Sequence, residues 1–150
     1  MQLLIENRQK KIKVDRRRLR LTANKIIREL DCGDKEISLV LVDNDQIQEI
    51  NRQYLQRDYP TNVISFSQIE GDFGNLNPNL LGDIIISVER AARDSEAGGL
   101  TFDDELDFLF IHGLLHLLGY EHENTTAVKE KIMKDKTEEL FYHLKGFTIE

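Results

Sequence analysis

The sequence predicts an α+β fold, in which one mixed β-sheet of about four strands packs with about five helices. Its 150 residues match one ordinary domain and can bury a core without disulfides. Short β-branched runs occur along the chain together with amphipathic segments of helical periodicity. These strands and helices are interleaved irregularly, which indicates one mixed sheet. We therefore expect residues 1–150 to form a single domain.

Four segments have the composition of strands. Glu36–Val42 (EISLVLV) alternates and then becomes wholly apolar, and Asp83–Val88 (DIIISV) is β-branched and apolar, as in a buried strand. Gln2–Asn7 and Asn62–Ser67 are the other two candidates. The Gly- and Asn-rich stretch Gln68–Leu81 predicts a loop.

Two helices are expected in the N-terminal half. Apolar residues repeat at helical spacing after Asp15, which suits an N-cap, and Gly33 suits the C-terminal stop. A second, shorter helix runs through Tyr54 and is capped by Asp43 or Asn44.

Three further helices are expected in the C-terminal half. The first is Glu89–Ala97, ended by the glycine pair that begins at Gly98. The second follows the cap Thr101 and ends near Leu118, and the third covers about Thr126–Leu144. The apolar residues of the second are expected in the core: Leu106, Phe110, Leu114 and Leu117.

The composition excludes several classes of protein. The single cysteine, Cys32, has no partner for a disulfide within the chain. The apolar run Met1–Ile5 is shorter than that of a signal peptide and is followed directly by charged residues. No apolar stretch approaches the roughly 20 residues that span a membrane. We therefore expect a cytoplasmic protein with no membrane partner.

Charge is distributed unevenly along the chain. The formal net charge is −7, which argues against a nucleic-acid partner. Residues 1–30, however, carry ten Lys or Arg and three Asp or Glu, a net charge of +7, which leaves −14 on the other 120 residues. This basic segment is either a patch that binds phosphate groups or a solvated face that balances an acidic body.

Three of the four histidines lie within eleven residues. His112 and His116 are four residues apart on a predicted helix, and therefore on one face, where both can bind one ion. Gly119 tolerates the left-handed conformation that ends this helix and can bring His122 back to the same ion. Three imidazoles leave a fourth tetrahedral position open, as in catalytic zinc sites. The sequence therefore predicts one zinc ion at a helix end, although copper, nickel and cobalt also bind such ligands.

Gly113 separates this pattern from a similar one in peptidases. The spacing H-x-x-x-H-x-x-G-x-x-H is that of metzincins, which need a glutamate directly after the first histidine as general base. Glycine there counts against peptide hydrolysis, and we expect it to open space for a bulky substrate. The fourth histidine, His143, stands alone on the last predicted helix and is expected at the surface or in the core.

The segment His112–His122 (HGLLHLLGYEH) resembles the signature of the YbeY family of bacterial endoribonucleases. Asn51–Phe66 (NRQYLQRDYPTNVISF) resembles a second block of that family, and Gly82-Asp83-Ile84 and Glu105-Leu106 also match, so the resemblance covers essentially the whole chain. It implies a single-domain α+β fold with one zinc ion on three histidines. It also implies cleavage of single-stranded RNA, maturation of the 3′ end of small-subunit rRNA, and ribosome quality control. The implied partners are rRNA, the small ribosomal subunit and its assembly factors.

One position departs from the family pattern. The family has an arginine directly after the tyrosine that Tyr54 matches, whereas this chain has Leu55 there and its nearest basic residue is Arg57. The planar fork of arginine suits a phosphate group. Arg57 is therefore predicted to be the catalytic arginine that reaches the scissile phosphate. The alternative is a solvated loop arginine.

Other roles stay open at this level. Glu105 lies seven residues before His112, on nearly the same helix face, and either it or Asp83 would orient a ligand histidine. Ser65 would bond RNA or only the sheet backbone. Two functions compete with the endoribonuclease: a metallopeptidase-like zinc hydrolase with a base such as Glu105 or Glu121, and a non-catalytic metal-binding ribosome assembly factor.

Overall fold

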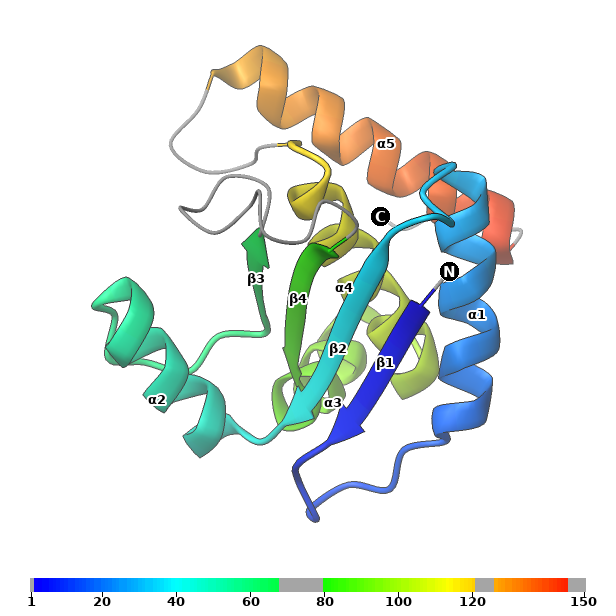
Figure 1. Ribbon diagram of the computed structural model, residues 1–150. Coiled ribbons are helices and arrows are strands. Elements are labelled where there is room, and N and C mark those ends of the chain that lie inside the picture. Colours follow the sequence, from blue (N-terminus) through cyan, green and yellow to red (C-terminus); the bar gives the residue numbers. More distant parts are fainter. Residues whose placement is uncertain (1, 68–79, 121–125, 146–150) are drawn as a thin grey trace.

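The computed structural model describes residues 2–67, 80–120 and 126–145. Within these residues, four strands form one sheet and five helices pack around it (Figure 1). No helix in this part of the chain has the length and apolar character needed to cross a membrane. In chain order, the elements are β1 (Gln2–Asn7), α1 (Arg16–Glu29), β2 (Glu36–Val42), α2 (Asn44–Leu55), β3 (Val63–Ser67), β4 (Leu80–Ser87), α3 (Val88–Gly98), α4 (Phe102–Leu117) and α5 (Ala127–Lys145).

The sheet is mixed, as the sequence predicts. Its strand order is β1-β2-β4-β3, so β1 and β3 are the two opposite edges. The strands β1, β2 and β4 run parallel, and β3 runs antiparallel to β4. The predicted α+β fold, with about four strands and five helices, is confirmed for the described residues.

Alternating side chains give the sheet two different faces. On one face, Leu39 and Ile84 belong to the main core, which α1, α3, α4 and α5 complete. On the other face, Val40 and Ile85 form a smaller cluster with Ile47 of α2. The four residues of α4 expected in the core are all buried, namely Leu106, Phe110, Leu114 and Leu117. As a result α4 packs across β3 and β4, while α2 lies beside β3 (Figure 1).

Most helix boundaries follow the predicted caps. The side chain of Asp15 accepts a hydrogen bond from the first turn of α1, and Asp43, rather than Asn44, caps α2. The end of α1 differs from the prediction, because Asp31 and not Gly33 takes the left-handed conformation, with φ 54°. Aspartate enters this backbone region more readily than most residues, so a glycine is not required there.

The last strand begins earlier than predicted. The expected strand Asp83–Val88 starts at Leu80, and Val88 already belongs to α3. Leu80 pairs with Glu36 of β2. Pairing with a distant strand therefore overrides a local sequence that favours a loop. The rest of the predicted loop, residues 68–79, lies outside the described residues.

A buried ionic cluster ties α4 to two neighbouring helices. Asp107 on α4 is fully buried and accepts a hydrogen bond of 3.0 Å from the guanidinium of Arg18 on α1. The ammonium of Lys145 on α5 lies 2.6 Å from the same carboxylate. Removing one member of such a pair leaves an uncompensated buried charge. The cluster therefore fixes how α4 is seated between α1 and α5.

Candidate active site

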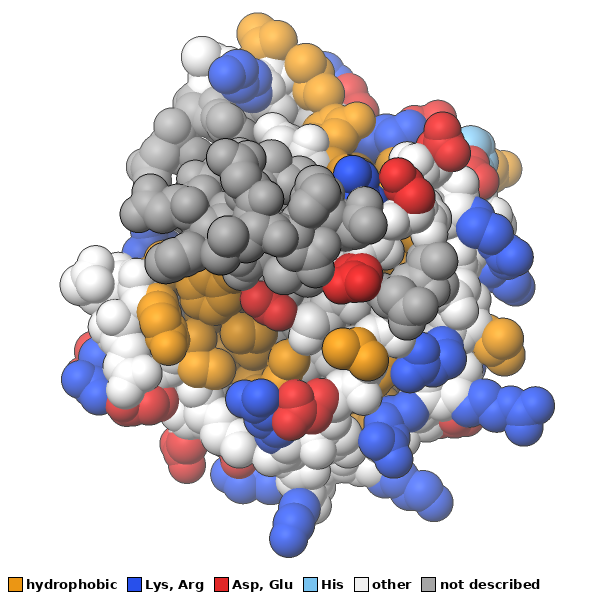
Figure 2. All heavy atoms as spheres, in the orientation of Figure 1, with side chains coloured by type: hydrophobic (Ala, Val, Ile, Leu, Met, Phe, Trp, Pro, Cys, Tyr) orange, Lys and Arg blue, Asp and Glu red, His pale blue; other side chains and the backbone are white. Residues whose placement is uncertain are grey.

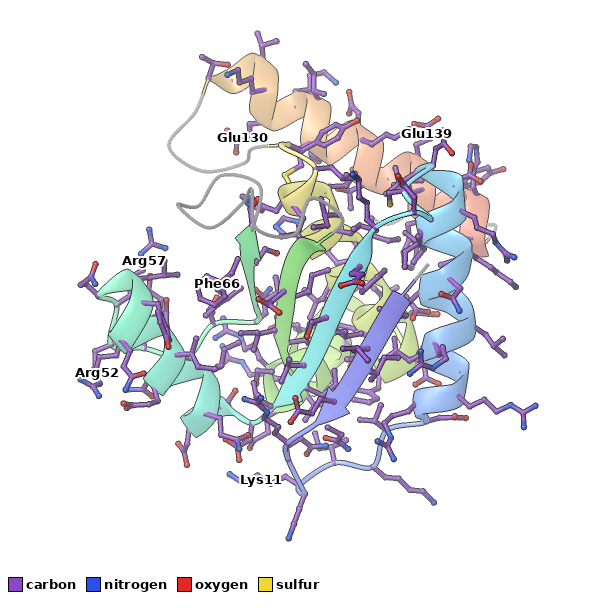
Figure 3. All side chains as sticks on the ribbon, in the orientation of Figure 1. Lys11, Arg52, Arg57, Phe66, Glu130 and Glu139 are labelled. Atoms are coloured by element: carbon purple, nitrogen blue, oxygen red, sulfur yellow. The ribbon has the colours of Figure 1, made fainter. Side chains whose placement is uncertain are left out.

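A cavity of about 440 Å³ lies between α2, β3 and α4. The wall combines apolar, aromatic, hydroxyl, imidazole and guanidinium groups, among them those of Leu55, Arg57, Tyr59, Val63, Ser65, His112 and His116. Figure 3 labels Arg57 at the end of α2 and Phe66 on β3, the two elements that flank this region. The fold thus brings Arg57 and two of the three predicted metal ligands to one cavity.

The two histidines project from the same side of α4. Residues four apart on a helix are neighbours, and the ring centroids of His112 and His116 lie 5.8 Å apart, with an interplanar angle of 64°. The neighbouring apolar side chains of α4, such as Leu114 and Leu115, are fully buried. The core therefore fixes the rotation of α4 about its axis and with it the direction of both imidazoles.

Gly119 ends α4 in the manner that its position predicts. Its φ is 99°, in the left-handed region. Its N–H donates to the carbonyl of His116 at 3.1 Å, and the N–H of Tyr120 donates to the carbonyl of Leu115 at 3.0 Å. This pair of bonds is the Schellman arrangement, which reverses the chain. His122, the third predicted ligand, lies outside the described residues.

The residues present fit a metal ion in part. In residues 2–67, 80–120 and 126–145, no group of three or more His, Cys, Asp or Glu side chains is arranged to hold a metal. His112 and His116 nevertheless supply two nitrogen donors on one cavity wall. Zn–N bonds are about 2.0–2.1 Å long, and two rings at the observed separation can both reach one ion. A third protein ligand would then have to come from outside the described residues.

Gly113 contacts the sheet rather than the cavity. A methyl group at this position would lie 2.7 Å from Cγ2 of Ile84 and 3.1 Å from Oγ of Ser65. Successive helix residues are rotated by about 100°, so the neighbour of a cavity-facing histidine points elsewhere. The expectation that Gly113 opens space for substrate is therefore wrong. Its role is to let α4 approach β3 and β4.

Ser65 connects β3 to α4 at the level of the histidines. Its hydroxyl donates a hydrogen bond of 3.0 Å to the carbonyl of Gly113. The partner of Ser65 is thus the helix backbone, not the sheet backbone considered from the sequence. Because Gly113 directly follows His112, this bond fixes the position of the histidine pair relative to β3.

The loop after α2 carries Arg57 to the cavity wall. Gln56 adopts the left-handed conformation that ends α2, and the N–H of Arg57 donates to the carbonyl of Asn51 at 3.2 Å. The buried side-chain amide of Asn51 donates to the carbonyl of Tyr59 at 2.9 Å. Leu55, where the motif resemblance predicts an arginine, lines the same cavity as Arg57. The turn at Gln56 therefore places both Leu55 and Arg57, the two possible positions for a catalytic arginine, on one wall of the cavity.

Tyr59 is a cavity residue for which no sequence motif predicts a role. Its side chain is 52% exposed although it is aromatic, and it lines the cavity beside Arg57. Nearby, Tyr54 is 64% exposed and meets the ring of Phe66 edge-on, with centroids 5.6 Å apart. An aromatic residue in a short polar loop next to the predicted arginine is the sequence signal that indicates such a role.

Neither carboxylate considered as a partner for the histidines lines the cavity. Asp83 precedes Ile84 on β4 and shares the sheet face of Ile85, so its side chain points away from α4. Glu105 is buried in the first turn of α4, about two helical turns before His112. Burial, together with the carboxylate of Asp94, raises the pKa of Glu105 to about 7. Asp83 therefore does not face His112 or His116 on α4.

The fold and the cavity together define a class of protein. An open cavity that presents imidazole nitrogens and a guanidinium has the groups of a hydrolase that acts on phosphate esters. The chain matches the family model described as Endoribonuclease YbeY over residues 4–145. It therefore belongs to the YbeY family of endoribonucleases, hydrolases that act on RNA.

Individual relatives agree with this assignment. The chain is 53% identical over 150 residues to the endoribonuclease YbeY of Syntrophus aciditrophicus, a match that covers 100% of this chain and 94% of that protein. It is 50% identical over 141 residues to that of Syntrophotalea carbinolica, covering 94% of each. A Thermotoga maritima protein known from a solution structure superposes with a TM-score of 0.65 at 26% identity, covering 96% of this chain and 89% of that one. The resemblance inferred from the sequence motifs is confirmed.

Proposed function

We propose that this chain is a zinc-dependent endoribonuclease that cleaves single-stranded RNA in the cavity between α2, β3 and α4. The observation that carries the proposal is that His112, His116 and Arg57 line the same cavity. A cavity of about 440 Å³ that is open to solvent can admit one nucleotide of a flexible strand.

One zinc ion would be held by His112, His116 and His122. The first two lie on one side of α4, and the reversal at Gly119 supports the return of the chain toward them. Bound zinc supplies Lewis-acid chemistry at a phosphate group and at water. The bond from Ser65 to Gly113 makes Ser65 a positioning residue for the two helical ligands.

Arg57 would bind the scissile phosphate. A guanidinium donates two parallel hydrogen bonds to phosphate oxygens and stabilises the negative charge that grows on them during cleavage. The backbone bond from Arg57 to Asn51 holds this residue at the cavity wall. Arg57 would thus act in place of the family arginine, whose position Leu55 occupies.

Tyr59 would give the site its preference for single strands. An exposed aromatic ring offers a surface on which an unpaired base stacks, and bases in a duplex are not available for such stacking. The half-exposed ring of Tyr59 borders the same cavity as Arg57. A base on Tyr59 would place the adjoining phosphate near the guanidinium.

The cellular role that we propose is maturation of the 3′ end of small-subunit rRNA and ribosome quality control in the cytoplasm. The partners would be rRNA, the small ribosomal subunit and its assembly factors. Residues 1–150 would act as one domain. Membership of the YbeY family supports this role.

Metal analysis coupled to cleavage of a labelled single-stranded RNA tests the proposal. We expect about one zinc ion per chain in the wild type, and loss of both zinc and cleavage in His116→Ala. His143→Ala is the matched control, because His143 is a surface histidine paired with Glu29; it should keep both. Zinc loss with full RNA cleavage would show that the metal is not catalytic. Cleavage of peptides but not RNA would favour a peptidase.

A further inference from the structure

The outward side of α1 forms a strongly basic surface. Figure 2 shows Lys and Arg side chains gathered along the side of the molecule that α1 occupies. Apart from Arg8 and Lys11, the exposed cations of α1 and of the loop before it are Lys10, Lys13, Arg16, Arg17, Arg20, Lys25 and Arg28. We call this set the α1 basic face. It contributes most of the +7 charge of residues 1–30 in a chain of net charge −7.

Most of these cations are not used to stabilise the fold. Three other basic residues of the same segment, Arg8, Lys11 and Arg18, form ion pairs with acidic side chains. On the α1 basic face itself, Arg20 donates to a backbone carbonyl of β1. The other six cations form no ion pair with any described residue, although the rest of the chain carries an excess of acids. Their charge remains available to a partner.

The placement of the arginines also opposes the local preference of a helix. Positive side chains at a helix N-terminus are unfavourable, because the helix dipole is positive there. The first turn of α1 nevertheless begins with Arg16 and Arg17 and contains no acidic residue. The first turn of α4 instead has Asp103, Asp104 and Glu105, as the dipole favours. Arg16 and Arg17 thus oppose the local dipole preference, as residues of functional surfaces often do.

The α1 basic face is distant from the cavity. α1 packs next to β1, whereas the cavity is bordered by β3, and these strands are the opposite edges of the sheet. Strands lie about 4.8 Å apart, so three strand spacings separate the two edges. The α1 basic face and the cavity therefore lie toward opposite edges of the sheet.

The chemistry of the face indicates the form of nucleic acid that it suits. Proteins that bind single strands combine cations with aromatic stacking surfaces, but α1 contains no aromatic residue. Duplex RNA is bound mainly through phosphates and ribose hydroxyls along its backbone. The 14 residues of α1 span about 21 Å, a length along which a duplex presents several phosphates.

Lys25 and Arg28 also line a groove of about 420 Å³ between α1 and α5, where Glu29 is paired with His143.

We infer that the α1 basic face binds the phosphate backbone of a double-stranded RNA segment next to the single strand that enters the cavity. The inference rests on the proposed action on RNA and adds a second contact to it. RNA with a helix joined to a single-stranded tail would be held at both places. The duplex would be bound without regard to its sequence, because phosphates carry no sequence information.

Binding of an RNA hairpin, measured by fluorescence anisotropy at several salt concentrations, tests the inference. The test variant is Arg17→Gln/Lys25→Gln/Arg28→Gln, three exposed positions without ion pairs to described residues. We expect hairpin binding to weaken about tenfold or more at 0.1 M salt, and the slope of log K against log salt to become shallower by about 2–3. Cleavage of a short unstructured RNA should stay within twofold of the wild type. The thermal midpoint should fall only slightly, because no ion pair with a described residue is lost and only Arg28 stands in the last turn of α1, where the helix dipole favours a cation.

A matched control removes the same charge elsewhere. Lys129→Gln/Lys131→Gln/Lys134→Gln changes three exposed lysines of α5, where acidic residues such as the labelled Glu130 and Glu139 are interspersed (Figure 3). It should leave hairpin affinity and salt slope unchanged. Equal loss in both triple variants, or no loss in the α1 variant, would overturn the inference. So would α1-dependent binding of poly-glutamate without α1-dependent binding of the hairpin, which would indicate a protein partner.

These measurements separate the inference from the proposed function. Hairpin binding needs neither cleavage nor metal. If the wild type failed to cut single-stranded RNA, the proposed function would fail while the binding comparison remained valid. If cleavage depended on His116 but hairpin binding did not depend on α1, only the inference would fail.

Discussion

The cavity beside α4 and the α1 basic face both present cations, but in different surroundings. At the cavity, Arg57 lies among imidazoles, a hydroxyl and the exposed ring of Tyr59. On the α1 basic face, cations follow one another along a helix that has no aromatic residue. The cavity is suited to enclose one nucleotide and react with it, whereas the face is suited to follow a backbone.

The two regions also differ in how they are built. The cavity depends on contacts between residues far apart in the chain, such as the bond from Ser65 to Gly113. The α1 basic face depends on one helix and the loop before it. Changes at these packing contacts, such as at Gly113, should therefore affect chemistry and stability together. Changes at the face should affect binding alone.

The largest expected effect is at Arg57. Arg57→Ala should lower the rate of cleavage of a short single-stranded RNA about 100-fold, because the growing charge on the phosphate loses a donor. Hairpin binding should be nearly unchanged. Arg52→Ala is the control, since Arg52 is an exposed α2 residue paired with Glu49.

A rescue sharpens this prediction. Leu55→Arg introduced into Arg57→Ala places an arginine directly after Tyr54, where the motif resemblance predicts one, at a position that lines the same cavity. We expect it to recover much of the lost rate. Wild-type activity in Arg57→Ala would refute the catalytic assignment of this residue.

The next effect concerns Gly113. Gly113→Ala would force a methyl group to within 2.7 Å of Ile84 and should lower the free energy of unfolding by about 1–3 kcal/mol. It should also reduce RNA cleavage by moving His112 away from β3. Gly98→Ala is the control, because no atom lies within 4 Å of a methyl group there. Chemical denaturation and cleavage rates measure both effects, and unchanged stability in Gly113→Ala would contradict the contact.

Tyr59→Ala should have a smaller and more specific effect. Loss of one stacking surface should raise the KM for single-stranded RNA about tenfold, since stacking on an aromatic ring contributes about 1–3 kcal/mol per base. The kcat and the affinity for a hairpin should change little. Tyr142→Ala on α5, also half exposed, serves as the control. An equal rise of KM in both variants would argue against a role of Tyr59 in binding.

The smallest effect tests a group that belongs to neither region. The pKa of Glu105 is raised to about 7, above that of the unfolded chain, so ionisation of Glu105 destabilises the fold as pH rises from about 4.5 to 7. Glu105→Gln should therefore raise the free energy of unfolding at pH 8 by about 1 kcal/mol. The difference should vanish at pH 4, where the carboxyl is protonated in both states. A constant difference across this pH range would contradict the proposed titration.

Local sequence patterns predict much of the fold. Capping residues such as Asp15 and Thr101, and the glycine at position 119, mark helix ends because each satisfies backbone groups within a few residues. The predictions from local patterns fail where pairing with a residue distant in the sequence determines the secondary structure. Leu80 is in a strand because it pairs with Glu36, and no local pattern contains that information.

The α+β class, the placement of two histidines on one helix face, the basic segment and the family can all be predicted from the sequence. These depend on spacing and composition, which are properties of the chain alone. Folding is needed to show that Gly113 contacts Ile84 and Ser65, that Asp83 faces away from α4, and that Arg57 and Tyr59 share a cavity with His112 and His116. It also places the basic segment across the sheet from that cavity. Such relations arise from packing between residues far apart in sequence, where close approach and strand order, not local preference, fix the neighbours.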